Sequence, residues 1–449
     1  MRQFAFALTV TILCCVGAQA EPVPISEIVQ QALHKAPALL HAQGDVTAAE
    51  RELALVRQSL SMPQLTVSAL PIGLFEDSVQ GRVTLSAGLS LPTGTTVRLS
   101  YTGSISYTAS SFRGALSGEL VQPLLFDFSL TDAALDLYRR TEALDEAKQT
   151  LAEVQHQVTL DVLSALLDLT VARESIAIAQ ARVALSQKLF SEVRRRVQSG
   201  QAGQTDLLAA QIELRQRELE LATLQRDFAL AQEKLFATYG LEKTLTWQAP
   251  TVKDELKDFA EVLLHLEITP EVVGKDARVR RAAQQVADAE RLLKKAQQDA
   301  LPQVGLTLTY DDQSAGWGVG ITLRHSFLTD QSLKREEAQQ ALITAQRTLD
   351  SVKETVRLEL LAQKNSLQEA YSQLEVLALK EELLQLQHAM KQQQFERGLL
   401  SPMDWEAFLI EEREFENERR AALYRLAIAY LRYKNSWGLS FSLKEVFDE

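Results

Sequence analysis

The side chains best able to do chemistry in this chain are its histidines and carboxylates. None of the histidines has a second histidine, a cysteine or a carboxylate at metal-ligand spacing within a loop, so we expect no metal site. The sequence also contains no glycine-rich phosphate loop, no Gly-x-Ser-x-Gly elbow and no His-Glu-x-x-His helix. We therefore expect no catalytic residue, no cofactor and no enzyme. The six histidines are His34, His41, His156, His265, His325 and His388.

Two glycines, each followed six positions later by an aspartate, form a more specific candidate site: Gly200 with Asp206, and Gly398 with Asp404. Glycine suits the left-handed position that ends a helix, and an acid suits the first turn of the next helix. Ser401 and the proline after it are typical of a helix start. Two interpretations stay open: the aspartates only cap helices, or they form a carboxylate ring when copies assemble around an axis.

These glycines are landmarks of an internal repeat with an offset of 198 residues. No glycine or proline occurs at positions 124–199 or 321–397, which predicts two very long helices. Apolar residues recur there at three- and four-residue steps among Gln, Glu, Lys and Arg, as in coiled coils. Shorter helices are expected to return over 204–239 and 403–437. Helices this long cannot bury their apolar stripes alone, so we expect lateral partners from the same chain and from other copies.

The segment before the first long helix alternates apolar and polar residues over 83–91 and 97–107, around a turn at Pro92. This predicts two strands, each with one apolar and one polar face. Such strands suit a transmembrane barrel or a soluble antiparallel sheet about equally. The second repeat has shorter strands at 304–310 and 316–327. The first repeat carries 41 additional residues, enough for one extra hairpin.

The N-terminus has the features of a secretory signal: Arg2, an apolar stretch and an Ala-Gln-Ala motif, with cleavage expected after Ala20. Cys14 and Cys15, the two cysteines of the chain, would leave with the signal. The bulky residue before Cys14 argues against lipidation. A formal net charge of −12 argues against nucleic-acid binding, which needs a basic face. No later run reaches the ~18 apolar residues of a transmembrane helix.

The repeats divide the chain into five predicted parts. Residues 1–20 are the signal peptide, and 246–274 link the two repeats. The first repeat, 21–245, contains a β segment at about 64–122 and a helical hairpin at about 131–239. The second repeat, 275–440, contains a β segment at about 303–327 and a helical hairpin at about 329–437. Residues 441–449 form a C-terminal tail.

This order of elements, used twice, resembles the TolC family of outer-membrane efflux proteins over about residues 26–438. The most specific motifs are Arg196, Gly200, Asp206 and Ala210 in the first tip, Gly398 and Asp404 in the second, and the segment 121–127 before the first long helix. Each motif alone is weak. The doubled spacing together with the β insertions carries the resemblance.

The resemblance implies a mainly α fold with β-strands: coiled-coil hairpins form a periplasmic tube, and three chains close one transmembrane β-barrel in the outer membrane. It implies an exit duct of a tripartite efflux pump or type I secretion system. Its partners would be a periplasmic adaptor and an inner-membrane pump. Arg196, Gly200, Arg397 and Gly398 would dock the adaptor, and Asp206 and Asp404 would belong to the periplasmic gate or cap helices. The alternative is an exported coiled-coil structural or adhesive protein with a soluble sheet.

Several positions depart from the family pattern. The usual lock joins an Asp of the first tip to Tyr and Arg around the second glycine, where this chain has Phe395 and Leu400. We therefore do not expect Asp206 to make that lock in its usual form. Ala407 replaces an additional acid, for which Glu406 could substitute only with a different orientation. For the barrel, four strands per chain and twelve in total are favoured over six per chain.

Overall fold

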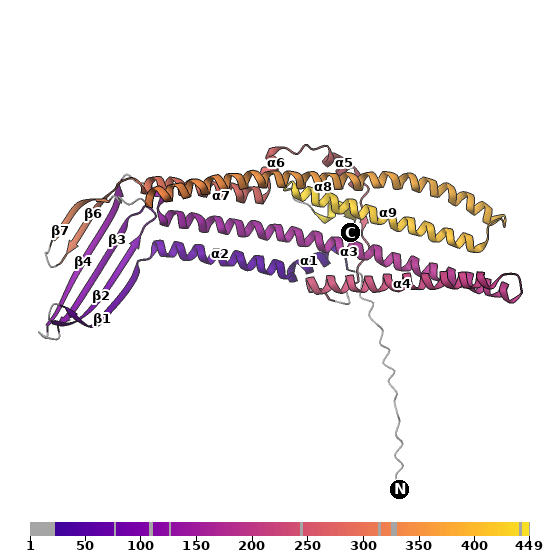
Figure 1. The fold of residues 1–449 in the computed structure, drawn as a ribbon, viewed down its shortest axis with the longest axis horizontal. Helices are drawn as coiled ribbons and strands as arrows, with labels where there is room; N and C mark the ends of the chain where they lie inside the picture. Colours follow the sequence, from indigo (N-terminus) through magenta and orange to yellow (C-terminus); the bar gives the residue numbers. More distant parts are fainter. Residues whose placement is uncertain are drawn as a thin grey trace, which may run out of the picture.

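The computed structural model describes residues 23–75, 78–106, 111–124, 127–242, 246–312, 316–324, 330–439 and 442–448. The predicted signal peptide and its cleavage site at Ala20 lie outside these residues. The molecule is a long rod, with a β-sheet at one end and two helical hairpins reaching the other (Figure 1). No helix in the described part of the chain is both long enough and apolar enough to cross a membrane.

The helical hairpin of the first repeat has a counterpart in the second repeat. In the first, a short helix pair leads into four strands, a long helix and a return helix: α1 (Ile25–Lys35), α2 (Pro37–Ser61), β1 (Gln64–Phe75), β2 (Ser78–Ser90), β3 (Thr96–Ser106), β4 (Ser111–Leu124), η1 (Phe128–Leu130), α3 (Asp132–Gln198) and α4 (Gln204–Tyr239). The second repeat contains α7 (Ala277–Asp299), β6 (Gln303–Asp311), β7 (Gly316–Arg324), α8 (Asp330–Glu396) and α9 (Pro402–Ser436). α3 and α8 each contain 67 residues and are therefore roughly 100 Å long.

The breaks between helices follow from the backbone chemistry of single residues. Pro37 occupies the first turn of α2, where its missing N–H costs nothing, so the chain bends between α1 and α2. At the start of α3, the Thr131 hydroxyl accepts from the Ala134 N–H at 3.1 Å and donates to the carbonyl of Pro92 at 2.7 Å. Thr131 therefore caps the long helix and fixes it to the β2–β3 turn.

At the sheet end of the rod, six strands in the described part of the chain form one antiparallel sheet in the order β1-β2-β3-β4-β6-β7. The expectation of four strands per chain is therefore wrong. The additional hairpin does not decorate the sheet: the 41 extra residues supply two strands that pair in register with their neighbours. The pairing of β4 with β6 (Leu124 with Val304, Leu120 with Leu308) joins the two repeats. Sequence periodicity could identify the strands but not this pairing between distant segments.

The two faces of the sheet differ in chemistry. On one face, hydroxyls pair across strands: Ser100 with Ser117 at 2.7 Å and Thr307 with Thr322 at 3.2 Å. The other face is apolar and uncovered in the single chain. On β7 this face carries Trp317, Val319, Ile321 and Leu323, which are 70–74% exposed. A soluble protein would cover such a continuous apolar surface.

The main core lies at mid-length of the rod, where the helices are held by a belt of short elements. The belt consists of β5 (Thr251–Val252), α5 (Leu256–Leu264), α6 (Pro270–Lys275), α10 (Leu443–Val446) and β8 (Phe447–Asp448). β5 pairs with β8, and α5 and α6 lie on the outside of α8 (Figure 1). The indole N–H of Trp247 donates to the Thr170 hydroxyl at 2.9 Å, which anchors the belt to α3. Leu163, Leu426 and Tyr433 are fully buried here.

Candidate functional sites

The two tip glycines end the long helices in the left-handed conformation. Gly200 has φ +74° and Gly398 has φ +70°. After each glycine the chain folds back onto the helix: the Gln201 N–H donates to the Arg196 carbonyl and the Leu399 N–H to the Gln394 carbonyl, both at 2.8 Å. Glycine is required by the backbone here, and a side chain at either position would meet open space.

Both tip aspartates bond to the start of their return helices. Asp206 Oδ2 accepts from the Gly203 N–H at 3.0 Å. In the second tip the Ser401 hydroxyl accepts from the Asp404 N–H at 3.1 Å and donates to Asp404 Oδ2 at 2.6 Å. These bonds account for the aspartates as helix-start residues within one chain. A gate role remains a prediction, because it depends on how copies are arranged.

The predicted docking residues gather at the same end of the rod. Arg196 lies in the last turn of α3 and forms an ion pair with Glu192, one turn earlier. Arg397 follows the last residue of α8 and is exposed. Together with Gly200 and Gly398 they belong to the two hairpin ends, which lie at the end of the rod away from the sheet (Figure 1).

The second tip has an aromatic cluster that explains one departure from the family. Phe395 stacks on Trp405, with ring centroids 5.6 Å apart and planes 14° apart. Trp405 also contacts Phe408, which is buried, and His388 edge-on. His388 Nδ1 lies 2.6 Å from Glu412 Oε1 across α8 and α9. No local sequence pattern indicates this pair, because its members are separated by 24 residues and lie on different helices.

Near the tips, polar contacts join the two hairpins of one chain along α3 and α9. Lys188 Nζ is 2.7 Å from Glu406 Oε1, and Arg182 forms an ion pair with Glu414. Further along, the Asn417 amide donates to the Val171 carbonyl at 3.2 Å. Glu406 therefore pairs with a lysine of the first hairpin of the same chain, and its substitution for the acid missing at Ala407 stays a prediction.

Toward the sheet, α3 makes a second polar seam with α7. Arg281 contacts Glu153 at 3.0 Å, and Lys295 forms an ion pair with Asp132. Between these pairs, burial, followed by the nearby Asp288 carboxylate, raises the pKa of Glu142 to about 7. One long helix of the first repeat thus contacts the second repeat through charged groups along much of its length.

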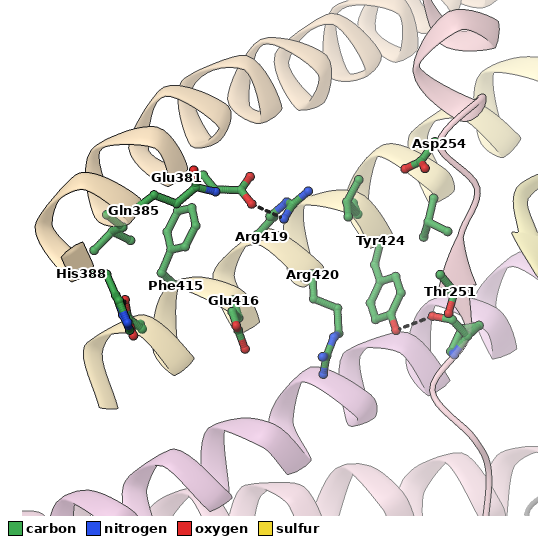
Figure 2. Close-up of a pocket in the computed structure, with 15 residues that line it drawn as sticks. Thr251, Asp254, Glu381, Gln385, His388, Phe415, Glu416, Arg419, Arg420 and Tyr424 are labelled. Atoms are coloured by element: carbon green, nitrogen blue, oxygen red, sulfur yellow. Dashed lines mark hydrogen bonds and ion pairs between the residues drawn. The ribbon is translucent and has the colours of Figure 1, made fainter. Parts of the chain in front are cut away.

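A groove of about 690 Å³ lies between α8, α9 and the belt (Figure 2). The Arg419 guanidinium donates to Glu381 Oε1 at 2.7 Å, and the Tyr424 hydroxyl donates to the Pro250 carbonyl at 2.9 Å. Both bonds lie within the groove wall and fix α9 to its neighbours. Within the described residues no cluster of three His, Cys, Asp or Glu side chains could hold a metal ion.

Long helical hairpins that end in paired tips, a belt at mid-length and a sheet with one uncovered apolar face together match the fold of TolC-like outer membrane channels. Residues 28–241 match the family described as outer membrane efflux protein. The match lies in the first repeat and agrees with the predicted resemblance to the TolC family of outer-membrane efflux proteins, and the chain is a protein of the outer membrane. The family is one of transport proteins and not of enzymes.

Solved structures share the fold over nearly the whole chain. The outer membrane protein VceC of Vibrio cholerae aligns with a TM-score of 0.63 at 14% identity, covering 93% of this chain and 97% of its own. The outer membrane channel CmeC of Campylobacter jejuni gives 0.62 at 12% identity, covering 94% and 88%. The open-state channel MtrE of Neisseria gonorrhoeae gives 0.57 at 13% identity, covering 92% and 89%. No curated protein sequence matches the chain significantly.

Proposed function

We propose that three copies of this chain form one continuous export duct, with a barrel in the outer membrane and a helical tube in the periplasm. The observation that carries the proposal is the uncovered apolar face of the six-stranded sheet. Its side chains are as exposed in the single chain as surface residues, yet they are the types that bury in lipid. Lipid on the apolar face and water on the hydroxyl-rich face would give each face of the sheet a solvent that matches its side chains.

The edges of the sheet explain why several copies are needed. β1 and β7 are the two edge strands, and their outer backbone groups need partners inside a membrane. Six strands alternate in direction, so β7 of one copy would lie antiparallel to β1 of the next. Three copies with six strands each would give eighteen strands, a number at which barrels leave an aqueous channel.

The helical part offers matching surfaces. α8 exposes Val376, Leu379, Leu383 and Leu386 at 54–68%, with the heptad spacing of a coiled-coil seam. α4 exposes Leu208, Ile212, Leu219 and Leu230 at 58–69%. Within one chain the helices contact in the order α4, α3, α9, α8, so these two stripes lie on opposite edges of the wall. Each would pack against the other stripe of a neighbouring copy.

The partners follow from the tips. We propose that Arg196, Gly200, Arg397 and Gly398 dock a periplasmic adaptor, which connects the duct to an inner-membrane pump. Asp206 and Asp404 would narrow the entrance in addition to starting their helices. VceC, CmeC and MtrE are themselves outer membrane proteins, and two of the three are described as channels, which supports the same use of this fold.

The test is isolation of the protein from outer-membrane fractions and reconstitution in planar bilayers. We expect heat-resistant trimers that conduct ions. Leu383→Glu, which places a charge in the α8 stripe, should convert trimers to smaller species. Val262→Glu is the matched control, since Val262 on the belt is similarly exposed at 66%. A monomer or dimer recovered from the soluble periplasm, without conductance, would contradict the proposal and favour a structural or adhesive coiled-coil protein.

A further inference from the structure

The strands of the two repeats differ in length, and β4 continues past the end of its partner β6. β4 pairs with β6 only from Ser117 to Leu124, and its register ends where Ser117 faces Asp311. β4 itself continues for six more residues, to Ser111, paired with β3 throughout. These six residues extend roughly 20 Å along the strand. In Figure 1, β1–β4 are drawn longer than β6 and β7 and end below them in the view.

The short hairpin carries the markers of a membrane surface at its end. Tyr310 and Trp317 lie opposite each other in the last apolar row, with ring centroids 4.9 Å apart. Aromatic pairs of this kind concentrate at the boundary between lipid and water. Asp311 and Asp312 follow immediately and are exposed. Asp311 faces Ser117 on the hydroxyl-rich face and does not meet lipid. The Asp312 carboxylate at the end of the strand would be costly in hydrocarbon, so the boundary lies at this row.

The longer strands continue past that row with an open edge. Within the described residues, no strand lies beside Ser111–Ala115 on the side away from β3. Backbone N–H and C=O groups without partners are not tolerated in a lipid interior, but water satisfies them. The open edge therefore belongs outside the bilayer.

The inner face of this extension is basic. Arg82 on β2 and Arg113 on β4 both face Ser104 of β3 directly across the ladder. Residues directly opposite one another share a face, so both arginines lie on the face that carries the paired hydroxyls. No acidic residue of β2, β3 or β4 occupies this row.

We propose that the distal part of β1–β4 stands outside the outer membrane as an extracellular mouth of the duct, with Arg82 and Arg113 on its inner face. The inference rests on the proposed membrane barrel. Three such extensions would surround the exit with six guanidinium groups. Their field attracts anions, so the mouth favours passage of anionic solutes over cations of the same size.

The first experiment uses single cysteines, because the sequence contains no cysteine after Cys15. Phe112 on the extension and Val319 on β7 lie on the same apolar face and are similarly exposed in the single chain, at 63% and 72%. Intact cells carrying Phe112→Cys or Val319→Cys are treated with a membrane-impermeant maleimide. We expect Phe112→Cys to be labelled at least tenfold faster, and both cysteines to react equally after denaturation. Ile105→Cys, on the neighbouring strand, provides a second extension variant if Phe112→Cys does not form trimers.

Protection of both positions in membrane-inserted trimers would overturn the extracellular mouth while leaving the duct intact. Labelling of both at the same rate would overturn the membrane placement of the sheet and the proposed duct with it. The basic inner face is tested by reversal potential in a KCl gradient. The double variant Arg82→Gln, Arg113→Gln should shift the selectivity toward K⁺. The double variant with lysine at both positions keeps the charge and should keep the wild-type selectivity. An unchanged reversal potential in the glutamine pair would exclude the arginines from the conducting path.

Discussion

Lys188 on α3 and Glu406 on α9 form an ion pair of 2.7 Å that ties the first hairpin to the second close to their tips. The contact lies within one chain, and Arg182 with Glu414 repeats it further from the tips. Near the tips, these charged side chains join α3 to α9, whereas nearer the belt the same two helices pack through buried apolar residues. A charged seam is weaker than an apolar one in water, so this is where we expect the two hairpins to separate when the entrance widens.

The first prediction concerns this seam. Glu406→Gln removes the ion pair and should increase the fraction of time the channel conducts in planar bilayers. Both side chains are well exposed, at 55% and 38%, so the loss in unfolding free energy should stay below about 1 kcal/mol. Glu411→Gln, on the same helix, is the control for charge removal. Equal open probabilities for the wild type and both variants would show that the pair does not restrain the tips.

The second prediction uses Asp404 and its neighbour Ser401, whose bonds separate capping from gating. Ser401→Ala removes the hydroxyl that caps α9 and should cost about 1 kcal/mol of stability while keeping the carboxylate. Asp404→Ala removes the carboxylate, and if Asp404 lines the entrance it should also reduce block by multivalent cations. The readouts are thermal unfolding and bilayer current with a trivalent cation. Unchanged block in Asp404→Ala would leave helix capping as the whole role of this residue.

The third prediction concerns adaptor docking at the second tip. Gly398→Trp places a large side chain in open space at the tip and should abolish export while trimers still form. Gly438→Trp is the matched control, since Gly438 has nearly the same φ, +69°, and similarly open surroundings but lies at the other end of α9. Export assays and heat-resistant trimers on gels would be compared. Wild-type export by Gly398→Trp would exclude this tip from docking.

The fourth prediction follows from Glu142 in the seam between α3 and α7. Its pKa is raised from 4.5 to about 7, so the folded chain binds this proton more tightly than the unfolded chain. Stability should therefore fall as pH rises from about 4.5 to about 7 and change no further above that range. Glu142→Gln should remove this decline, which thermal unfolding between pH 5 and pH 8 would measure. Glu220→Gln on α4 should keep it.

An unaltered pH profile in Glu142→Gln would assign the proton to another group. After burial, the Asp288 carboxylate is the next cause of the raised pKa of Glu142. Asp288→Asn removes that repulsion and lowers the pKa of Glu142 in the folded chain, so the decline in stability should end at a lower pH.

Local patterns in the sequence determined the helices, their ends and the two chemical faces of the strands. The absence of glycine and proline allows α3 and α8 to run for 67 residues, and Gly200 and Gly398 must end them because the backbone turns left-handed there. Alternation along the strands, seen at Val97, Leu99 and Tyr101, assigned an apolar face. These features depend on residues only a few positions apart, so they can be read from one segment at a time.

The tertiary structure alone decided which distant segments meet. β4 pairs with β6 across more than 170 residues, which makes one six-stranded sheet and leaves Ser111–Ala115 beyond the shorter hairpin. The seam partner of Lys188 and the carboxylate beside His388 likewise come from another helix. Periodicity is equally consistent with many registers and neighbours. The choice among them is made by packing and backbone pairing over the whole chain, which no local pattern encodes.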